Sequence, residues 1–559
     1  MNEQDKIFEQ FKQHSVAEFF KKNRQMLGFS GKVRSLTTII HEYVTNSLDA
    51  CEEAGILPDI KVKIEELAEK EHYRVTVEDN GPGIPKSHVG RALGQMLSGT
   101  KFHRYLQQRG QQGIGASGCT MYSLLTTGKA IKALTGFSGK IVECNISVDF
   151  QTNAPVITEV KEYDGEFRGL KVEAEFKEVK YEKSNYGVYE YLRRTALANP
   201  HASISLIEPT GETAQFPRSV DAIPRKPMEI KPHPLGIGPH DLLDFAKRKT
   251  EHRRISSFLQ DSFSRFSAGK VNELKELVPD IDLNKKPEEM TWEEAEKIVN
   301  AFKQMKWIAP ALDAIVPIGK EQIEKSFTNI FTPEVLMVTE RSPKVYRGGI
   351  PFMVEAALAY GGGVAAAGKK GEIMRFANRV PLPFDSSGCA ITEAVKNIDW
   401  KRYDIKNFEE EPVVVLINLV SVYVPYTSAG KQAISSEEDI IDEIKNAVME
   451  AARGVQRYLS GKRKVHELEN KRKVVTRYVE QLSNDVSDLA GEKNKEKVKK
   501  ELMKIIEEKY LNSNDELEAK EELKNAGGED APVEEEEENE SEAPKPKKGK
   551  QKKLNEEEG

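Results

Sequence analysis

Glu78-Asp79-Asn80-Gly81-Pro82-Gly83-Ile84 directly follows residues 73–77, in which apolar and polar side chains alternate. Such alternation is typical of a half-buried strand, so the sequence predicts a strand that ends in a tight turn. Asp79 ends that strand, where its carboxylate can accept a hydrogen bond from an adenine amino group. Gly81 and Gly83 allow a planar base to approach the backbone. The alternative is an ordinary turn, because Asn-Gly and Pro-Gly are generic turn pairs.

Upstream of this turn, residues 36–54 have the spacing of an amphipathic helix. Glu42, Asn46 and Asp49 stand at positions i, i+4 and i+7, so they project from one face of that helix. An asparagine can give a magnesium ion an oxygen ligand, and a glutamate can orient and deprotonate a water molecule. The alternative is a solvated polar face opposite a buried stripe. That stripe would consist of Leu36, Ile40, Tyr43 and Val44.

A glycine-rich stretch lies further along the chain. Gly99-Thr100-Lys101 is followed by Gly110-Gln111-Gln112-Gly113-Ile114-Gly115-Ala116-Ser117. A glycine-rich loop that runs into a helix presents backbone N–H groups and the positive end of the helix dipole to phosphates. Gly94 and Gly99 could act as hinges that let the segment between the two motifs close as a lid. A flexible surface loop of the same composition is the alternative.

A fourth motif is Lys431, in Pro425-Tyr426-Thr427-Ser428-Ala429-Gly430-Lys431-Gln432. It comes shortly after residues 413–420, which are apolar throughout, as in a central strand. A lysine that follows a rigid strand can reach a γ-phosphate as a point charge. On spacing alone, one of many solvated lysines is the favoured alternative.

Residues 363–370 resemble a phosphate-binding loop of the GxxxxGK type but lack the final Ser or Thr that would hold magnesium. The preceding residues 357–360 look like a poor strand. We therefore expect a flexible basic loop here and no nucleotide site.

The 559 residues change character several times, as expected of a multidomain chain. Residues 1–228 alternate helical and strand patterns, which predicts an α+β sandwich and not a strict βαβ repeat. A proline-rich stretch at 217–234 leads into a mostly helical region at 229–306. Strand patterns return over 307–470, and helical spacing continues over 471–511.

The net charge of −7 lies mostly at the end of the chain, because residues 529–559 hold 12 acidic and 6 basic side chains. The charged tail at 512–559 has too little apolar content to fold and is predicted to be disordered. The rest of the chain is nearly neutral, which leaves a nucleic-acid partner open.

Composition also excludes some classes of protein. No stretch approaches the ~18–20 apolar residues that a membrane span needs, and Met1-Asn2-Glu3-Gln4-Asp5 has no apolar core behind it. The 4 cysteines form no CxxC pair, so neither a disulfide framework nor a structural zinc site is expected. We expect a cytoplasmic protein that does not associate with a membrane.

Glu42 and Asn46, the Asp79 turn and the 110–115 glycines, in this order, resemble the GHKL ATPases, which include gyrase B, MutL proteins, heat-shock chaperone ATPases and histidine kinases. The resemblance implies a Bergerat-fold ATPase α/β sandwich over 1–228 that uses ATP and Mg²⁺. It implies Glu42 as general base, Asn46 as magnesium ligand and Asp79 as adenine reader. The implied ATP contacts also include Gly81, Gly83, Thr100, Lys101, Gly110, Gln111, Gln112, Gly113, Ile114, Gly115, Ala116, Ser117 and Lys431. The Gly-Thr motif of that family appears here as Gly169-Leu170, without the hydroxyl.

A narrower resemblance covers about residues 10–480. Residues 99–104, 110–117, 376–382 and 400–403 are similar to the B subunits of the type IIB topoisomerases, the archaeal topoisomerase VI family. This implies an all-helical helix-two-turn-helix insert at 229–306. It also implies an α/β transducer domain at 307–470 with a long C-terminal helix and Lys431 as its switch lysine. A C-terminal helical segment at 471–511 would follow.

The activity implied by this resemblance is that of a coupled machine. ATP binding would dimerise two B subunits, with Glu42 and Lys431 as catalytic residues. The dimer would gate passage of one DNA duplex through a double-strand break made by an A subunit, in an A2B2 heterotetramer. Such an enzyme relaxes supercoils and decatenates double-stranded DNA in the nucleoid.

The sequence allows two interpretations of the candidate DNA contacts. Trp400-Lys401-Arg402-Tyr403 interleaves aromatic rings with cations, which suits phosphate contact and stacking, so Trp400, Lys401 and Tyr403 are candidate DNA contacts. The alternative is a Trp and a Tyr packed under a turn with solvated cations. The basic residues within 247–254 are a further candidate, with a solvated helix face as the alternative.

Two rival functions share part of the pattern. A MutL-like mismatch-repair ATPase or DNA clamp has the first three motifs but predicts neither the helical insert nor residues 400–403. A non-enzymatic, ATP-gated clamp would bind ATP without needing Glu42. A gyrase-like cleavage site at Asp280 and Asp282 is rejected, because no strand-borne Glu precedes it. We expect no DNA cutting by this chain alone.

Overall fold

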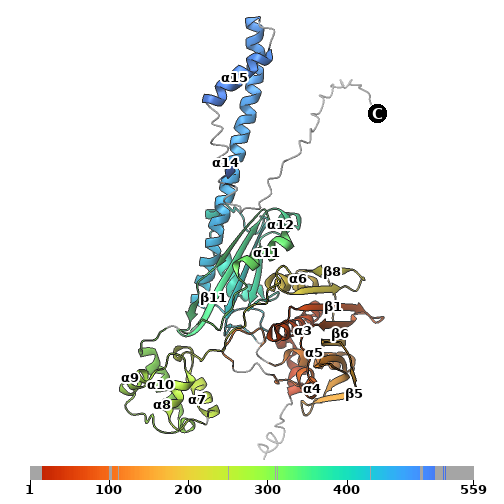
Figure 1. The fold of residues 1–559 in the computed structure, drawn as a ribbon, viewed down its shortest axis with the longest axis vertical. Coiled ribbons are helices and arrows are strands. Elements are labelled where there is room, and N and C mark those ends of the chain that lie inside the picture. Colours follow the sequence, from red (N-terminus) through yellow and green to blue (C-terminus); the bar gives the residue numbers. More distant parts are fainter. Residues whose placement is uncertain are drawn as a thin grey trace, which may run out of the picture.

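The computed structural model describes residues 16–99, 104–110, 113–249, 251–308, 310, 312–428, 430–491, 495–509, 520–521 and 523 of the chain. These residues form three lobes and a projecting helix (Figure 1). The N-terminal lobe spans 16–216, the helical lobe 239–304 and the C-terminal lobe 320–458. The predicted tail at 512–559 lies almost wholly outside the described residues.

An eight-stranded sheet, counted over the described residues, forms the N-terminal lobe, in the order β5-β4-β3-β6-β2-β1-β7-β8. Neighbouring strands are antiparallel except β1 and β7, which are parallel. The strands are β1 (Asp59–Glu66), β2 (His72–Asp79), β3 (Ile131–Phe137), β4 (Lys140–Val148), β5 (Pro155–Asp164), β6 (Gly169–Lys177), β7 (Ser203–Ile207) and β8 (Thr213–Phe216). The predicted strand before Asp79 is thus confirmed as β2.

Helices cover one face of this sheet. Buried and exposed residues therefore alternate along β1, and the other face of the strand stays exposed. The helices are α2 (Val16–Asn23), the 3-10 turn η1 (Arg24–Leu27), α3 (Lys32–Ala54), α4 (Lys86–Gly94), α5 (Gly115–Thr127) and α6 (Val188–Ala198). Helix α3 begins four residues before the predicted start and ends as predicted, with Gly55 in the left-handed conformation (φ +70°). Its predicted stripe is buried: Leu36, Ile40, Tyr43 and Val44 are at most 4 % exposed.

The helical lobe contains α7 (Pro239–Arg248), α8 (Ile255–Ser262), α9 (Ala268–Leu277), the turn η3 (Pro287–Glu289) and α10 (Trp292–Gln304), after the turn η2 (Pro234–Gly236). These helices lie within 229–306, the region that the sequence predicts to be mostly helical. Phenylalanines from α8 and α10 form its core with neighbouring aromatic rings, such as Phe302 and Trp307 at 5.9 Å. This lobe has its own core and hangs from one end of the C-terminal lobe (Figure 1).

The C-terminal lobe is built on a six-stranded sheet, again counted over the described residues. Its order is β10-β11-β14-β12-β13, with β9 also paired to β11. The strands are β9 (Val335–Glu340), β10 (Lys344–Tyr346), β11 (Ile350–Tyr360), β12 (Glu372–Ala377), β13 (Val380–Pro381) and β14 (Val413–Ser421). Strand β14 is buried at every position, which confirms the central strand predicted there. Its helices and turns are α11 (Lys320–Phe331), α12 (Gly363–Ala366), η4 (Ser386–Gly388), α13 (Ala390–Lys396) and η5 (Trp400–Tyr403).

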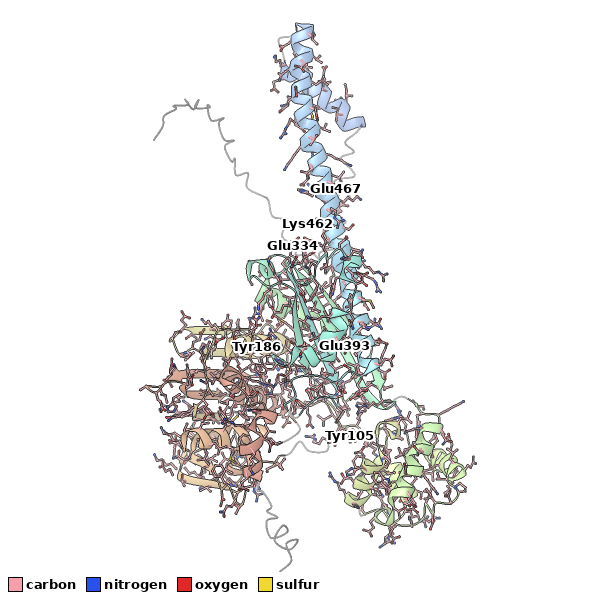
Figure 2. All side chains as sticks on the ribbon, turned by 180° about the vertical axis from the view of Figure 1, so that it is seen from behind. Tyr105, Tyr186, Glu334, Glu393, Lys462 and Glu467 are labelled. Carbon is pink, nitrogen blue, oxygen red and sulfur yellow. The ribbon has the colours of Figure 1, made fainter. Side chains whose placement is uncertain are left out.

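Helix α14 (Glu438–Ala490) starts on this sheet and projects beyond it for half its length (Figure 1). Ile444, Val448 and Val455 are fully buried on the sheet. Lys462 and Tyr458 both bond to Glu334 at the edge of the lobe, where Figure 2 labels Lys462 beside Glu334. Beyond this point α15 (Lys495–Lys509) folds back along α14. The boundary expected at residue 470 falls inside α14, which continues through it without a break.

The phosphate-loop-like stretch at 363–370 differs from expectation. Residues 357–360, judged a poor strand, are the end of β11, which is buried on both faces and therefore lacks the alternation of a half-buried strand. The glycines that follow form the short helix α12 and a turn. Lys369 pairs with Glu372 at 3.0 Å and lies 3.9 Å from Glu190. The basic loop is therefore partly ordered and held by carboxylates.

Within the described residues, no helix is both long and apolar enough to cross a membrane.

Candidate functional site

A cavity of about 370 Å³ opens where the N-terminal lobe meets the C-terminal lobe. Its walls come from α3, β2, β6, the turn after β2, the start of α5 and the loop after β14. From the residues predicted to act on a nucleotide, the cavity lining includes Glu42, Asn46, Asp79, Gly83, Gly110, Gly113, Ile114, Gly115, Ala116, Ser117 and Lys431. Thr100, Lys101, Gln111 and Gln112 lie outside the described residues. Gly81 is described but does not line the cavity.

Helix α3 contributes a carboxylate and an amide to the cavity. Glu42 and Asn46 are one turn apart, the Glu42 side chain is 31 % exposed and Asn46 is exposed. The third residue of the predicted face, Asp49, points elsewhere: it is buried and bonds to Arg109 at 2.7 Å. The predicted face therefore supplies two groups to the site and not three.

Asp79 is buried at the cavity floor and accepts three hydrogen bonds. Ser47 Oγ donates to its Oδ2 at 2.7 Å, and the N–H groups of Gly81 and Leu170 donate to its Oδ1 at 3.0 and 3.1 Å. Burial raises the pKa of the Asp79 carboxyl, and these donors partly offset that rise. A carboxylate has about four acceptor positions, so one on Oδ2 stays available to a donor in the cavity.

The turn after β2 can only be built from glycine at position 83. Gly83 has φ +74°, and a Cβ there would lie 2.1 Å from the Gly136 carbonyl oxygen on β3. Ile84 holds the same turn to β3, because its N–H donates to Thr135 Oγ1 at 2.7 Å. The motif is thus more than a generic turn: it packs against the neighbouring strand and presents Asp79.

Helix α5 begins at the cavity with Gly115, so its first N–H groups face the same space as Glu42. The first turn of a helix has unpaired N–H donors and a partial positive charge, which suits an anion. Ser117 Oγ donates back to the Ile114 carbonyl at 3.1 Å, which fixes the start of the helix. This arrangement can receive phosphate groups.

Lys431 reaches the cavity from the C-terminal lobe, in a loop that also places Gly430 and Gln432 there. The Tyr426–Ile434 bridge closes this loop, and Lys431 has φ +53°, a left-handed conformation that lysine rarely adopts. The charge of Lys431 is near enough to His41 to oppose its protonation. One cavity thus joins groups that lie far apart in the sequence.

Several lining residues had no signal in the sequence analysis. His41 lies beside Glu42, with Nε2 3.9 Å from Glu42 Oε1, and its Nδ1 is 3.2 Å from the Tyr191 hydroxyl. Burial lowers the pKa of His41, so the ring stays neutral near pH 7. Ser47 follows Asn46 directly, and its hydroxyl holds Asp79 in place. A search for a hydroxyl on the predicted helix that could orient Asp79 would have found it. Leu170, noted in the sequence only for its lack of a hydroxyl, contributes its backbone N–H to Asp79.

The Trp400–Tyr403 motif forms the turn η5, and both rings are 7 % exposed. Trp400 stacks on Phe408 with ring centroids 4.6 Å apart, and its Nε1 donates to the Val395 carbonyl at 3.1 Å. The rings therefore pack under a turn, which corrects the interpretation that they stack on DNA. Lys401 and Arg402 are exposed, so the cations alone can reach a phosphate.

The other charged candidates lie at the surface of the protein. In the helical lobe, Arg248 pairs with Asp244 and Lys249 with Asp261, while Arg253 and Arg254 are exposed. Asp280 pairs with Lys297. Within the part of the chain that the structure describes, no three His, Cys, Asp or Glu side chains gather as a metal site.

Comparison with known proteins identifies both large lobes. Residues 31–155 match the family of histidine kinase-, DNA gyrase B- and HSP90-like ATPases. Residues 310–472 match the transducer of the topoisomerase VI B subunit. The first match contains Glu42, Asp79 and the glycines, and the second contains Lys431.

Relatives match over nearly the whole chain. The B subunit of type 2 DNA topoisomerase 6 from Pyrococcus horikoshii is 46% identical, over 91% of this chain and 97% of its own length. The proteins of the same name from Pyrococcus abyssi and Methanothermobacter thermautotrophicus are 46% and 47% identical, over 93% and 85% of this chain and 100% and 91% of their own. The solved ATPase region of Saccharomyces cerevisiae topoisomerase II, 11% identical, gives a TM-score of 0.37 over 80% of this chain and 98% of that one. That value is too low to compare domain arrangement.

Proposed function

The chain belongs to the family of type 2 DNA topoisomerase 6 B subunits, and on that premise we propose that the cavity between Glu42, Asp79 and Lys431 is its ATP site. A member of this family is the ATP-driven part of a DNA topoisomerase. The observation that carries our proposal is the shared lining: one cavity receives side chains from the ATPase-like lobe and a lysine from the transducer-like lobe. The MutL-like alternative shares the first three motifs, but it does not account for the match of residues 310–472 to the topoisomerase VI B-subunit transducer.

We assign adenine recognition to Asp79. Its remaining acceptor position on Oδ2 would take a hydrogen bond from the adenine amino group, while Ser47, Gly81 and Leu170 hold the carboxylate in place. Gly83 lines the cavity near Asp79, so the base would meet backbone and no side chain at this position of the turn. Because the Asp79 carboxylate is buried, a bound base that offers no donor would leave one of its acceptor positions without a hydrogen bond, which costs binding free energy.

The phosphates would lie at the start of α5, where backbone N–H groups from 113 onward face the cavity. Gly110, Gly113, Ile114, Gly115, Ala116 and Ser117 form the described part of this lid. Thr100, Lys101, Gln111 and Gln112 remain predicted contacts. Lys431 would meet the γ-phosphate from the opposite side as a point charge.

A magnesium ion fits the polar side of the cavity, because the exposed Asn46 amide oxygen stands one turn from the Glu42 carboxylate and hard oxygen donors suit that ion. Asn46 would hold it together with the phosphates of the nucleotide. When bound, the ion would neutralise phosphate charge. Phosphoryl transfer to water needs positioning and charge stabilisation more than covalent chemistry, so Glu42 needs only to orient a water and accept its proton.

The partners follow from the family. We propose an A2B2 heterotetramer with an A subunit that cuts DNA, and dimerisation of the B subunits when ATP binds. An apolar stripe on α14 is exposed and suits the A subunit: Val474, Tyr478, Leu482, Val486 and Leu489 are 39–89 % exposed. Helix α15 covers a different stripe, which includes Val479 and Ser483, and so leaves this one open.

Reconstitution with a candidate A subunit tests the function. The pair should relax supercoiled DNA only with ATP and magnesium, and Glu42→Gln should retain nucleotide binding while it loses about 10²- to 10⁴-fold in turnover. A Leu482→Glu variant should lose co-purification with the A subunit, whereas Lys471→Glu on an exposed position of the same helix should retain it. Full turnover by Glu42→Gln would remove Glu42 from the mechanism.

A further inference from the structure

Asn80 lies in the turn after β2, directly after Asp79, and its side chain bonds to the segment that joins α3 to β1. Its Oδ1 accepts from the Asp59 N–H at 2.9 Å, and its Nδ2 donates to the Leu57 carbonyl at 3.0 Å. Asn80 is not among the residues that line the cavity. The amide therefore acts on the protein's own backbone and would not touch a bound nucleotide.

The Asn80 side chain extends the pairing of β1 with β2 by one step. The last backbone pair at this end of the two strands is Ile60 with Asp79, so Asp59 would stand opposite Asn80. A side-chain amide offers donors and an acceptor as a peptide group does, and its bonds to backbone can replace those of a strand. The chain can thus turn away from the sheet after Asp79 and still be held to β1.

The segment that Asn80 holds is itself fixed at both ends. At the end of α3, the Ile56 N–H donates to the Cys51 carbonyl at 2.9 Å, and the Pro58 carbonyl accepts from the Ser203 N–H on β7, also at 2.9 Å. Cys51 is fully buried. Asn80 therefore ties the turn to a helix and a strand that belong to the core of the N-terminal lobe.

The same turn carries one of the N–H groups that orient Asp79. The Gly81 N–H donates to Asp79 Oδ1 at 3.0 Å, and Asn80 stands between these two residues in the chain. Residues 81–83 are Gly-Pro-Gly, which have no side chain that can form a hydrogen bond. Within the turn at 80–83, the Asn80 amide is thus the side chain that can fix the direction of the Gly81 N–H.

We propose that Asn80 is a positioning residue for selection of the base: it keeps the Gly81 N–H on Asp79 Oδ1, so that Oδ2 presents its remaining acceptor position to an amino group. The proposal rests on the ATP site proposed above, in which Asp79 recognises adenine. Without the Asn80 amide, the turn and the Asp79 carboxylate can rotate, and an amino group on the base contributes less to binding. The proposed phosphate contacts at the start of α5 lie on another element and should not change.

The test uses the full chain with magnesium and two ligands that differ only in the amino group. One is a non-hydrolysable ATP analogue, and the other is the same analogue of purine riboside, which lacks the exocyclic amino group. Asn80→Ala removes the amide, and Asn80→Gln moves it by one methylene. Calorimetry gives the Kd of each ligand, steady-state kinetics with ATP gives kcat, and scanning calorimetry gives Tm.

Asp149→Ala is the matched control. Asp149 holds the turn between β4 and β5 in the same way, because its Oδ1 accepts from the N–H groups of Gln151 and Thr152 at 2.7 and 3.2 Å. It is not part of the cavity lining. This variant therefore removes two bonds between a side chain and the backbone of a turn in the same lobe, and it should leave base selection unchanged.

The wild type should bind the amino-bearing analogue roughly 10- to 150-fold more tightly than the purine analogue, the range for one hydrogen bond to a charged group. In both Asn80 variants this ratio should fall about fivefold or more, the value of one neutral hydrogen bond. The Kd of the purine analogue should stay within about twofold of wild type, and so should kcat at saturating ATP, because a loss of uniform binding leaves kcat unchanged.

The proposal is overturned if the ratio of the two affinities is unchanged, if both affinities fall equally together with Tm, or if Asp149→Ala lowers the ratio as much. Should Asn80→Ala not fold, Asn80→Gln decides alone. A wild type that binds both analogues equally would refute the assignment of Asp79 and this proposal with it. A wild type that binds neither would instead refute the proposed function.

Discussion

Gly115 lies against Glu42 so closely that a Cβ at position 115 would be 1.9 Å from Glu42 Oε2. The next nearest atoms, at 2.7 and 3.4 Å, also belong to Glu42. The first residue of α5 thus sets the position of the proposed general base. The phosphate-facing end of a helix and the carboxylate that activates water are in van der Waals contact.

Gly115→Ala should therefore lower turnover about a hundredfold and leave the fold intact. The added methyl meets only the flexible end of Glu42, which can move aside, but a displacement of about 1 Å at a catalytic group can lower the rate about a hundredfold. Steady-state ATPase kinetics and a melting curve check this. Gly118→Ala is the control on the same helix, because its Cβ would have only ordinary contacts from 3.4 Å. Equal activity of the two variants would contradict the assignment of Glu42.

Lys431→Ala should weaken hydrolysis and abolish ATP-stimulated strand passage. Removing one preorganised charge from a transition state lowers kcat by about 10²- to 10³-fold. The ATPase rate and the relaxation of supercoiled DNA with an A subunit measure the two effects. Lys370→Ala is the matched control, an exposed lysine in the stretch that resembles a phosphate loop. If Lys431→Ala and Lys370→Ala perform alike, Lys431 has no part in the mechanism.

The stability of the protein should fall as the pH drops below about 6.5. Burial lowers the pKa of His41 and of His201 from the ordinary value of 6.5. The unfolded chain therefore binds more protons than the folded one below that pH, and stability rises with pH. Each histidine contributes up to about 1.4 kcal/mol per pH unit until its folded pKa is reached.

Thermal unfolding between pH 5 and 8 measures this slope. His201→Gln retains a donor for Glu52, which the His201 Nε2 contacts at 2.8 Å, and should make the slope shallower. A variant with both histidines replaced by glutamine should be shallower still. An unchanged slope in the double variant would mean that other groups account for the loss.

Lys401 and Arg402 should contribute to DNA binding by charge alone. Each phosphate contact that is lost should reduce the salt dependence of binding, log K against log salt, by about 0.9. Lys401→Ala with Arg402→Ala, titrated against duplex DNA at several salt concentrations, measures this. Trp400→Phe retains the buried ring and should leave the salt slope unchanged. Loss of DNA binding in a stable Trp400→Phe would restore the aromatic interpretation.

Local sequence patterns were sufficient to predict the parts of the site that lie on a single helix or strand. The alternation before Asp79 and the helical spacing around Glu42 follow from periods of two and 3.6 residues, and both elements formed. Asp49 belongs to the same helical face, yet its partner Arg109 stands 60 residues away, so spacing could not show that it pairs instead of lining the cavity.

Other differences have equally specific causes. Trp400 carries an apolar ring in a charged motif, and the sequence leaves open whether such a ring points inward; packing on Phe408 decides it. Residues 357–360 were misjudged because a strand buried on both faces has no alternation. Leu170 contributes to the site through its backbone N–H, which donates to Asp79 Oδ1 and which no side-chain motif reports.

The central claim is that Glu42, Asn46, Asp79, the lid glycines and Lys431 surround one nucleotide. Calorimetric titration of the full chain with a non-hydrolysable ATP analogue, with and without magnesium, tests it most directly, together with Asp79→Asn. We predict magnesium-dependent binding at one site per chain that Asp79→Asn abolishes, because an amide would present a donor to Ser47, Gly81 or Leu170. Binding that is absent in the wild type, or that is unaffected by Asp79→Asn, would contradict the account.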